Sequence, residues 1–249
     1  MGTAPIVTVQ SPGPETTPSY LVAGSQPRNR LLFDQRIRKL PGTWVFVDSP
    51  QELSVDRLCQ IDPRYVFFLH WNWIVPTAIH DRWECVVFHM TDVPYGRGGS
   101  PLQNLMIRGH QETVLTALRM TNTLDGGPVY LRQPLQLDGS AEEIYCRTGQ
   151  LSVDMMIEII DTEPEPVPQV GEVTLFTRRT PDESQLSATI KDLRDLDSFI
   201  RMLDADGYPA AFLCLGDKKI EFRDSSLQGD RIIAKVEITN SVINGEDMT

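Results

Sequence analysis

The sequence predicts an α/β fold: a Rossmann-like, mostly parallel sheet with helices on both faces, plus a small C-terminal α+β portion with a β-hairpin. Two observations carry this prediction. Short apolar runs alternate with amphipathic segments from residue 19 to residue 162, a pattern typical of a parallel sheet with crossover helices. The composition then changes to a run of Glu and Pro at 163–168, which cannot be helix interior.

The first part of the chain predicts a β-α-β-α-β order. The strands are expected from three apolar runs, at 20–24, 44–47 and 65–69. One helix opens at Pro27 and stops at Pro41, and a second, at 54–59, takes Ser54 as its N-cap. Connections this short favour parallel pairing of the strands.

The middle of the chain extends the sheet. A fourth apolar run, 85–88, is followed at once by His89 and a turn-rich loop. Further elements are expected as a helix at 102–108, strands at 113–118 and 130–132, and a helix from a capping box at Ser140 to about Ile160.

Four segments are therefore expected. They are a disordered leader at 1–18, the Rossmann-like domain at 19–162, an extended linker at 163–171 and a C-terminal portion at 172–249. In the last of these, 195–203 predicts a helix, 211–215 and 219–222 a hairpin, and 232–238 a final strand.

Composition limits the function classes. With 23 basic against 34 acidic residues, the formal net charge is −11, which argues against a nucleic-acid partner and against electrostatic attachment to a membrane. No apolar run approaches the ~20 residues that a membrane span needs, and no targeting segment is recognised. The four cysteines form no CxxC pair, and the histidine spacing does not suggest a metal site. We expect a cytoplasmic protein without a metal.

Two polar residues follow strand ends, where α/β proteins carry their chemistry. His89 ends one apolar run, and Asp125 lies in the turn Leu124-Asp125-Gly126-Gly127-Pro128 shortly after another. A carboxylate near the imidazole would favour its protonated form and fix its orientation, so the two could form an acid–base pair. Each also has an ordinary structural interpretation, since Asp in such turns commonly bonds its own backbone.

The stretch 65–138 resembles the catalytic domain of the N10-formyltetrahydrofolate-dependent formyltransferases, and the sugar N-formyltransferases of the GDP-perosamine type most closely. The resemblance rests on four motifs in order, namely Trp73-Ile74-Val75-Pro76, Phe88-His89-Met90-Thr91-Asp92-Val93-Pro94, Gly96-Arg97-Gly98-Gly99-Ser100-Pro101-Leu102-Gln103, and the Asp125 turn.

The resemblance implies formyl transfer from N10-formyltetrahydrofolate to an amine, with an Asn, a His and an Asp as catalytic residues. His89 and Asp125 match the last two. The Asn should lie two residues before the His, where this chain has Val87. Three alternatives are open: an amide from elsewhere replaces it, with Asn72 the nearest candidate in the sequence, or a backbone N–H does so, or activity is reduced. Asn72 is taken as the replacement.

The resemblance also places the ligands. The folate is expected against Trp73, Ile74, Asn122, Leu124 and Asp125. The acceptor is expected near Arg97, Gly98, Arg178 and Arg179, although these arginines could equally be solvated surface charges.

The expected acceptor is a nucleotide-linked amino sugar for bacterial surface glycans such as O-antigen, lipopolysaccharide or capsule. The expected assembly is a homodimer, with no nucleic-acid partner. Two alternatives stay open: an amino-acid acceptor such as N5-hydroxyornithine, and a non-catalytic folate-binding module, which Val87 makes plausible.

Overall fold

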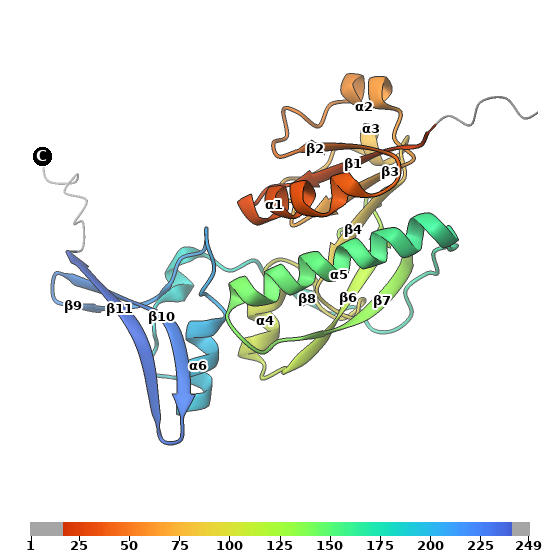
Figure 1. The fold of residues 1–249 in the computed structure, drawn as a ribbon. Coiled ribbons are helices and arrows are strands. Elements are labelled where there is room, and N and C mark those ends of the chain that lie inside the picture. Colours follow the sequence, from red (N-terminus) through yellow and green to blue (C-terminus); the bar gives the residue numbers. More distant parts are fainter. Residues whose placement is uncertain (1–16, 241–249) are drawn as a thin grey trace, which may run out of the picture.

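The computed structural model describes residues 17–240, so the expected leader at 1–18 lies almost wholly outside the described residues. The described chain forms a six-stranded sheet in the order β2-β1-β3-β4-β6-β7 (Figure 1). These strands are β1 (Ser19–Gly24), β2 (Thr43–Val47), β3 (Tyr65–Leu69), β4 (Cys85–His89), β6 (Glu112–Arg119) and β7 (Val129–Gln136). The predicted Rossmann-like fold is confirmed.

Strands β1 to β4 pair in parallel, whereas β6 is antiparallel to β4 and β7 is antiparallel to β6. The expected strand at 130–132 is longer than predicted and contains Pro134. A proline lacks the N–H that a central strand needs, so its place in β7, at the edge of the sheet, costs no pairing on the outer side.

Helices cover both faces of the sheet. In β3, Phe67 packs into the core beneath α1 (Pro27–Gln35) and α5 (Ala141–Thr162), and Phe68 packs into the core beneath α2 (Val55–Ile61) and α3 (Thr77–His80). Side chains of a strand alternate between its two faces. A strand buried on both faces therefore reads as one continuous apolar run, which is why the sequence revealed β3 so clearly.

Helix α5 begins where the capping box predicts. The Ser140 side chain accepts a hydrogen bond from the Glu143 N–H at 3.2 Å, and the Glu143 carboxylate accepts one from the Ser140 N–H at 2.8 Å. Ser54 caps α2 in the same way, accepting from the Arg57 N–H. Both caps satisfy backbone donors that lack a partner within the helix.

The segment 163–171, expected as an extended linker, contains no helix, and Val167 pairs with Val129 at the start of β7. The stretch 176–184 contains regular structure. Its first residue lies in β8 (Leu175–Phe176), which pairs in parallel with β5 (Arg97–Gly98), and a 3-10 turn follows at Pro181–Ser184. Helix α4 (Pro101–Ile107) follows β5, and a short 3-10 turn, Ile37–Lys39, follows α1.

The C-terminal part forms a separate three-stranded antiparallel sheet in the order β11-β10-β9, to one side of the main sheet in Figure 1. Its strands are β9 (Ala211–Leu215), β10 (Lys218–Gln228) and β11 (Arg231–Asn240), with α6 (Leu193–Arg201) packed against β10. The predicted helix, hairpin and last strand are all present, each extended or shifted by a few residues. Within residues 17–240, no helix is both long enough and apolar enough to cross a membrane.

Candidate functional site

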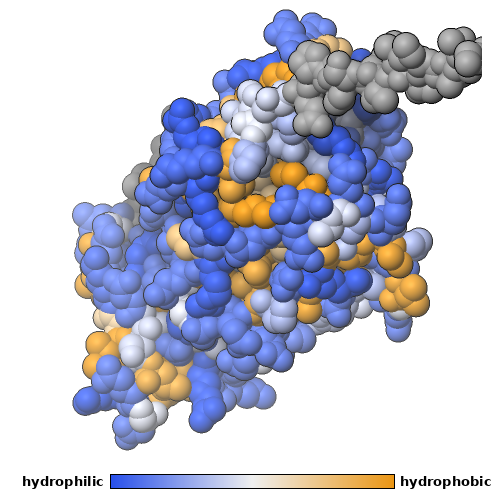
Figure 2. Space-filling model, turned by 45° about the vertical axis from the view of Figure 1, so that its right-hand side comes forward, coloured by the Kyte–Doolittle hydropathy of each residue, from blue (hydrophilic) through white to orange (hydrophobic). Residues whose placement is uncertain are grey.

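A cleft of about 920 Å³ opens where β3 and β4 end, at the carboxyl edge of the parallel strands, the usual ligand position in such sheets. Its lining comes both from the N-terminal part of the chain, with Arg28, His70 and Trp71, and from the later part, with Arg178 and Tyr208. The outer surface is mostly hydrophilic, with scattered hydrophobic residues, as Figure 2 shows for one face.

His89 is the last residue of β4 and is 6% exposed. Its Nε2 lies 2.8 Å from the carbonyl oxygen of Gly96. A carbonyl oxygen can only accept, so this contact places a proton on Nε2 and leaves Nδ1 as the nitrogen that can gain or lose one.

Asp125 lies in the turn after β6 with a backbone φ of 48°, the left-handed region that non-glycine residues rarely adopt. Its Oδ2 accepts a hydrogen bond from the Gly98 N–H at 2.9 Å and lies 3.6 Å from His89 Nδ1. The structure thus brings together the two residues that the sequence places 36 positions apart.

A 3.6 Å separation is longer than a hydrogen bond between nitrogen and oxygen. A proton on His89 Nδ1 is therefore attracted by the carboxylate but still free to bond a ligand atom placed between them. Within residues 17–240, Asp125 Oδ1 has no hydrogen-bond partner and can accept a proton or a hydrogen bond from a ligand.

The other predicted residues near the expected folate position fall into two groups. Asn72, Trp73 and Leu124 line the cleft together with Val87. Ile74, which is 97% exposed, and Asn122 do not line it. Asn72 is exposed, and its side-chain amide forms no hydrogen bond with any residue from 17 to 240. Trp73 packs edge-on against Trp71, whose buried Nε1 has no partner in the described chain.

The residues predicted to hold the acceptor all line the cleft. Arg97 points its guanidinium at Gln169, with hydrogen bonds of 3.0 and 2.7 Å. Arg178 is exposed, whereas Arg179 is largely buried over the ring of Phe199. Burial lowers the pKa of Arg179, although the Glu183 carboxylate acts in the opposite direction.

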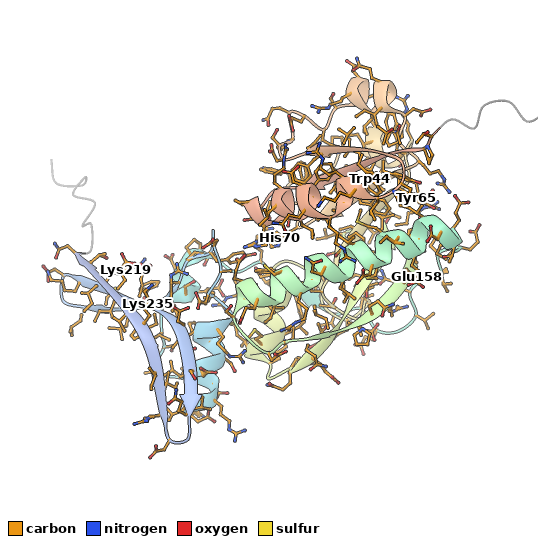
Figure 3. The ribbon with its side chains drawn as sticks, in the orientation of Figure 1. Trp44, Tyr65, His70, Glu158, Lys219 and Lys235 are labelled. Atoms are coloured by element: carbon orange, nitrogen blue, oxygen red, sulfur yellow. The ribbon has the colours of Figure 1, made fainter. Side chains whose placement is uncertain are left out.

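Sequence reasoning missed a second polar group in the cleft, centred on His70. This residue follows β3 with a φ of 49°, and Figure 3 shows it between α1 and the start of α5. Its Nε2 lies 3.2 Å from the Tyr208 hydroxyl, and its ring packs edge-on against Tyr145 at 4.9 Å. Burial, with the charges of Arg28 and Arg178, lowers the pKa of His70 to about 4.

Nothing in the sequence near His70 signals this group, because Tyr208 lies 138 residues away.

For metals, no cluster of three or more His, Cys, Asp or Glu side chains suited to a metal ion occurs among residues 17–240.

Comparisons with known proteins show which proteins this chain resembles. Residues 181–239 match the family described as the methionyl-tRNA formyltransferase C-terminal domain. A solved structure of methionyl-tRNA formyltransferase from Clostridium thermocellum is 37% identical, with a TM-score of 0.84 over 90% of this chain and 99% of that one. A sugar N-formyltransferase from a Shewanella species is 15% identical, with a TM-score of 0.64 over 85% of this chain and 98% of that one, and shares the fold alone.

Curated relatives give the same picture. Methionyl-tRNA formyltransferase of Halorhodospira halophila is 29% identical over 187 residues, which is 70% of this chain and 59% of the relative. That of Gluconobacter oxydans is 29% identical over 58% of this chain and 48% of the relative. The chain therefore spans about half to three fifths of the length of these two proteins.

These findings correct the expected acceptor. A nucleotide-linked amino sugar, with its role in O-antigen, lipopolysaccharide or capsule synthesis, was the wrong prediction, because the relatives with substantial identity are methionyl-tRNA formyltransferases. The match of residues 181–239 to the methionyl-tRNA formyltransferase C-terminal domain points to the same acceptor class.

The expected absence of a nucleic-acid partner is contradicted by the same relatives. The physical error was to use a whole-chain charge of −11 as if it were uniform. The cleft is lined by four arginines, Arg28, Arg97, Arg178 and Arg179, against the single carboxylate of Asp125. With the fold, the cleft and a relative matched over nearly its whole length, the chain belongs to the formyltransferase family.

Proposed function

We propose that this protein transfers the formyl group of N10-formyltetrahydrofolate to the α-amino group of methionyl-tRNA. The observation that carries the proposal is the His89–Asp125 pair, 3.6 Å apart in a cleft whose other charged side chains are arginines. Support for the acceptor comes from the 37% identity to a methionyl-tRNA formyltransferase structure that this chain covers almost completely.

The residues present suit the folate. The folate supplies the formyl carbon, and its flat ring system would lie against Trp73, a residue that lines the cleft and is 44% exposed. The buried Trp71 Nε1, which has no partner within residues 17–240, could donate to a ring heteroatom after a small shift. Leu124, 71% exposed at the rim, would add apolar contact.

His89 and Asp125 have separate tasks in the proposed reaction. As the amine attacks the formyl carbon, the new C–N bond forms and negative charge develops on the formyl oxygen. Protonated His89 donates from Nδ1 to that oxygen while Gly96 holds Nε2. Asp125 Oδ1 accepts the proton that the amine loses, directly or through water. The bond from the formyl carbon to N10 then breaks, and N10 takes up a proton.

Asn72 is proposed as the second donor to the formyl oxygen. Val87 lines the cleft but offers no polar atom, whereas the Asn72 amide is exposed in the same cleft with no partner in the described chain. Val87 also supports a second candidate, a folate-binding module without turnover.

The test measures formyl transfer to methionyl-tRNA by the wild type and by His89→Ala, Asp125→Asn and Asn72→Ala. Loss of a donor to a developing oxyanion should lower kcat about a hundredfold or more for His89→Ala. His110→Ala, an exposed histidine outside the cleft, is the matched control and should keep full activity.

The alternatives give different results. Transfer to free N5-hydroxyornithine or another amino acid, without transfer to methionyl-tRNA, would replace the acceptor and keep the chemistry. Folate binding without turnover on any amine would establish the non-catalytic module.

A further inference from the structure

The segment 163–174 connects the Rossmann-like domain to the C-terminal part. It is hydrogen-bonded to both loops that carry the candidate site. Val167 exchanges hydrogen bonds of 2.8 Å with Val129, next to the Asp125 turn. Further along, Thr174 donates to the Pro94 carbonyl at 3.1 Å and accepts from the Arg97 N–H at 3.0 Å. The segment therefore lies between the Asp125 turn and the loop that contains Arg97 and Gly98.

Gln169 lies midway along this connection and uses its whole side-chain amide. Its Nε2 donates to the carbonyl oxygens of Asp125 and Gly127, both at 2.8 Å. Its Oε1 accepts two hydrogen bonds from the Arg97 guanidinium, at 3.0 and 2.7 Å. An amide has two donors and two acceptor lone pairs, so its hydrogen-bonding capacity is fully used.

The partners determine which way the amide faces. A guanidinium can only donate and a peptide carbonyl can only accept, so the oxygen must face Arg97 and the nitrogen must face the turn. Any side chain lacking either group breaks one half of this arrangement. Arg97, expected from the resemblance to bind the acceptor, is therefore engaged within the protein, and no carboxylate of residues 17–240 pairs with it within 4.0 Å.

We propose that Gln169 is a positioning residue that holds the Asp125 turn against the Arg97–Gly98 loop and so keeps the Asp125 carboxylate in place beside His89. Its catalytic consequence rests on the function proposed above. Asp125 needs such support because its φ of 48° is unfavourable for a side chain with a Cβ. Gln169 holds its carbonyl oxygen, and Gly98 holds its carboxylate.

The contact between Gly98 and Asp125 offers a direct readout. The Gly98 N–H bonds Asp125 Oδ2, whereas the next amide, that of Gly99, bonds the Phe176 carbonyl at 3.1 Å. Amide hydrogen exchange of Gly98 therefore reports the position of Asp125, and that of Gly99 reports the integrity of the neighbouring strand pair.

The experiment compares Gln169→Glu and Gln169→Met with the wild-type full chain. The Glu variant can still accept from Arg97, but it places carboxylate oxygens against two carbonyl oxygens. The Met variant keeps the length of the side chain and removes every hydrogen bond. Val170→Ala, at a neighbouring side chain that is 87% exposed, is the control.

In both Gln169 variants we expect Gly98 to exchange about tenfold faster, the scale of one lost hydrogen bond, with Gly99 unchanged. Formyl transfer should show a kcat lower by about tenfold to a hundredfold with little change in KM for the folate, because misplacement of a catalytic group affects the reaction step. Val170→Ala should alter neither readout.

Unchanged exchange of Gly98 in both variants would overturn the proposal, as would equal acceleration at Gly98 and Gly99, which would mean general loosening. If the wild type transfers formyl groups to no amine, accelerated exchange at Gly98 alone still supports the positioning role, and only the proposed function fails.

Discussion

At the scale of single residues, the site depends on backbone positions that few side chains tolerate. His70 and Asp125 both have left-handed φ values, 49° and 48°, and both line the cleft. Such strain persists only where surrounding contacts hold it, and it concentrates at functional sites. For Asp125 the contacts come from Gly98 and Gln169, and for His70 the side-chain contacts come from Tyr208 and Tyr145.

His70 predicts a pH dependence of stability. Its pKa is lowered from 6.5 to about 4 in the folded protein, so the unfolded chain binds a proton more readily between these values. The contribution of neutral His70 is complete above pH 6.5 and is lost as the pH falls to 4. By linkage the loss amounts to about 3 kcal/mol of unfolding free energy.

His70→Asn should remove this dependence, because asparagine tolerates left-handed φ and does not titrate. Urea unfolding at pH 7, 5.5 and 4 would show a shallower decline for this variant than for the wild type. His110→Asn, at an exposed position, is the control. Parallel declines in wild type and His70→Asn would contradict the prediction.

At the scale of elements, local signals were sufficient wherever the bonding partners are close in sequence. The caps of α2 and α5 were predicted because Ser54 and Ser140 bond backbone groups three residues away. The paired strands β6 and β7 are consecutive in the chain, separated by residues 120–128. By contrast, β5 and β8 contain two residues each, and their paired residues lie 78 positions apart in the sequence. No local sequence pattern therefore predicts these two strands.

Ser140→Ala should destabilise the protein by about 1 kcal/mol, the usual effect of losing a helix N-cap. The Glu143 N–H would lose its acceptor at the start of a 22-residue helix whose buried face fills the main core. Urea denaturation measures the change. The comparison is Ser226→Ala, an exposed serine with no side-chain hydrogen bond in the described chain, which should stay within about 0.5 kcal/mol of wild type.

At the scale of the whole molecule, the distribution of charge matters more than its sum. A chain with a net charge of −11 places four arginines around one cleft. Glu142 pairs with Arg28 and Glu183 pairs with Arg179, whereas the influence of acidic residues farther from a ligand in the cleft falls off within a Debye length of about 8 Å. A phosphate-bearing acceptor is therefore compatible with the acidic chain.

Binding of methionyl-tRNA should weaken as salt rises, because each phosphate contact releases counterions. Arg178→Ala should reduce the slope of log Kd against log salt by about one unit. Arg231→Ala, an exposed arginine on the β10–β11 hairpin and outside the cleft, should leave the slope unchanged. Equal effects of the two variants, measured by filter binding or fluorescence anisotropy, would show that the cleft does not hold the acceptor.

The sequence by itself determined the fold class and most of the elements, because periodicity, caps and strand ends are local properties, and it suggested His89 and Asp125 as a possible pair. The tertiary structure decided that the two side chains lie 3.6 Å apart. Only the tertiary structure decided the surroundings of that pair. The chain must fold back across the sheet before Gln169 reaches Asp125, 44 positions away, or Tyr208 reaches His70, 138 positions away. The basic lining of the cleft arises in the same way. Arginines from distant segments line the cleft with a single lining carboxylate, that of Asp125, an arrangement that the net charge of the chain does not describe.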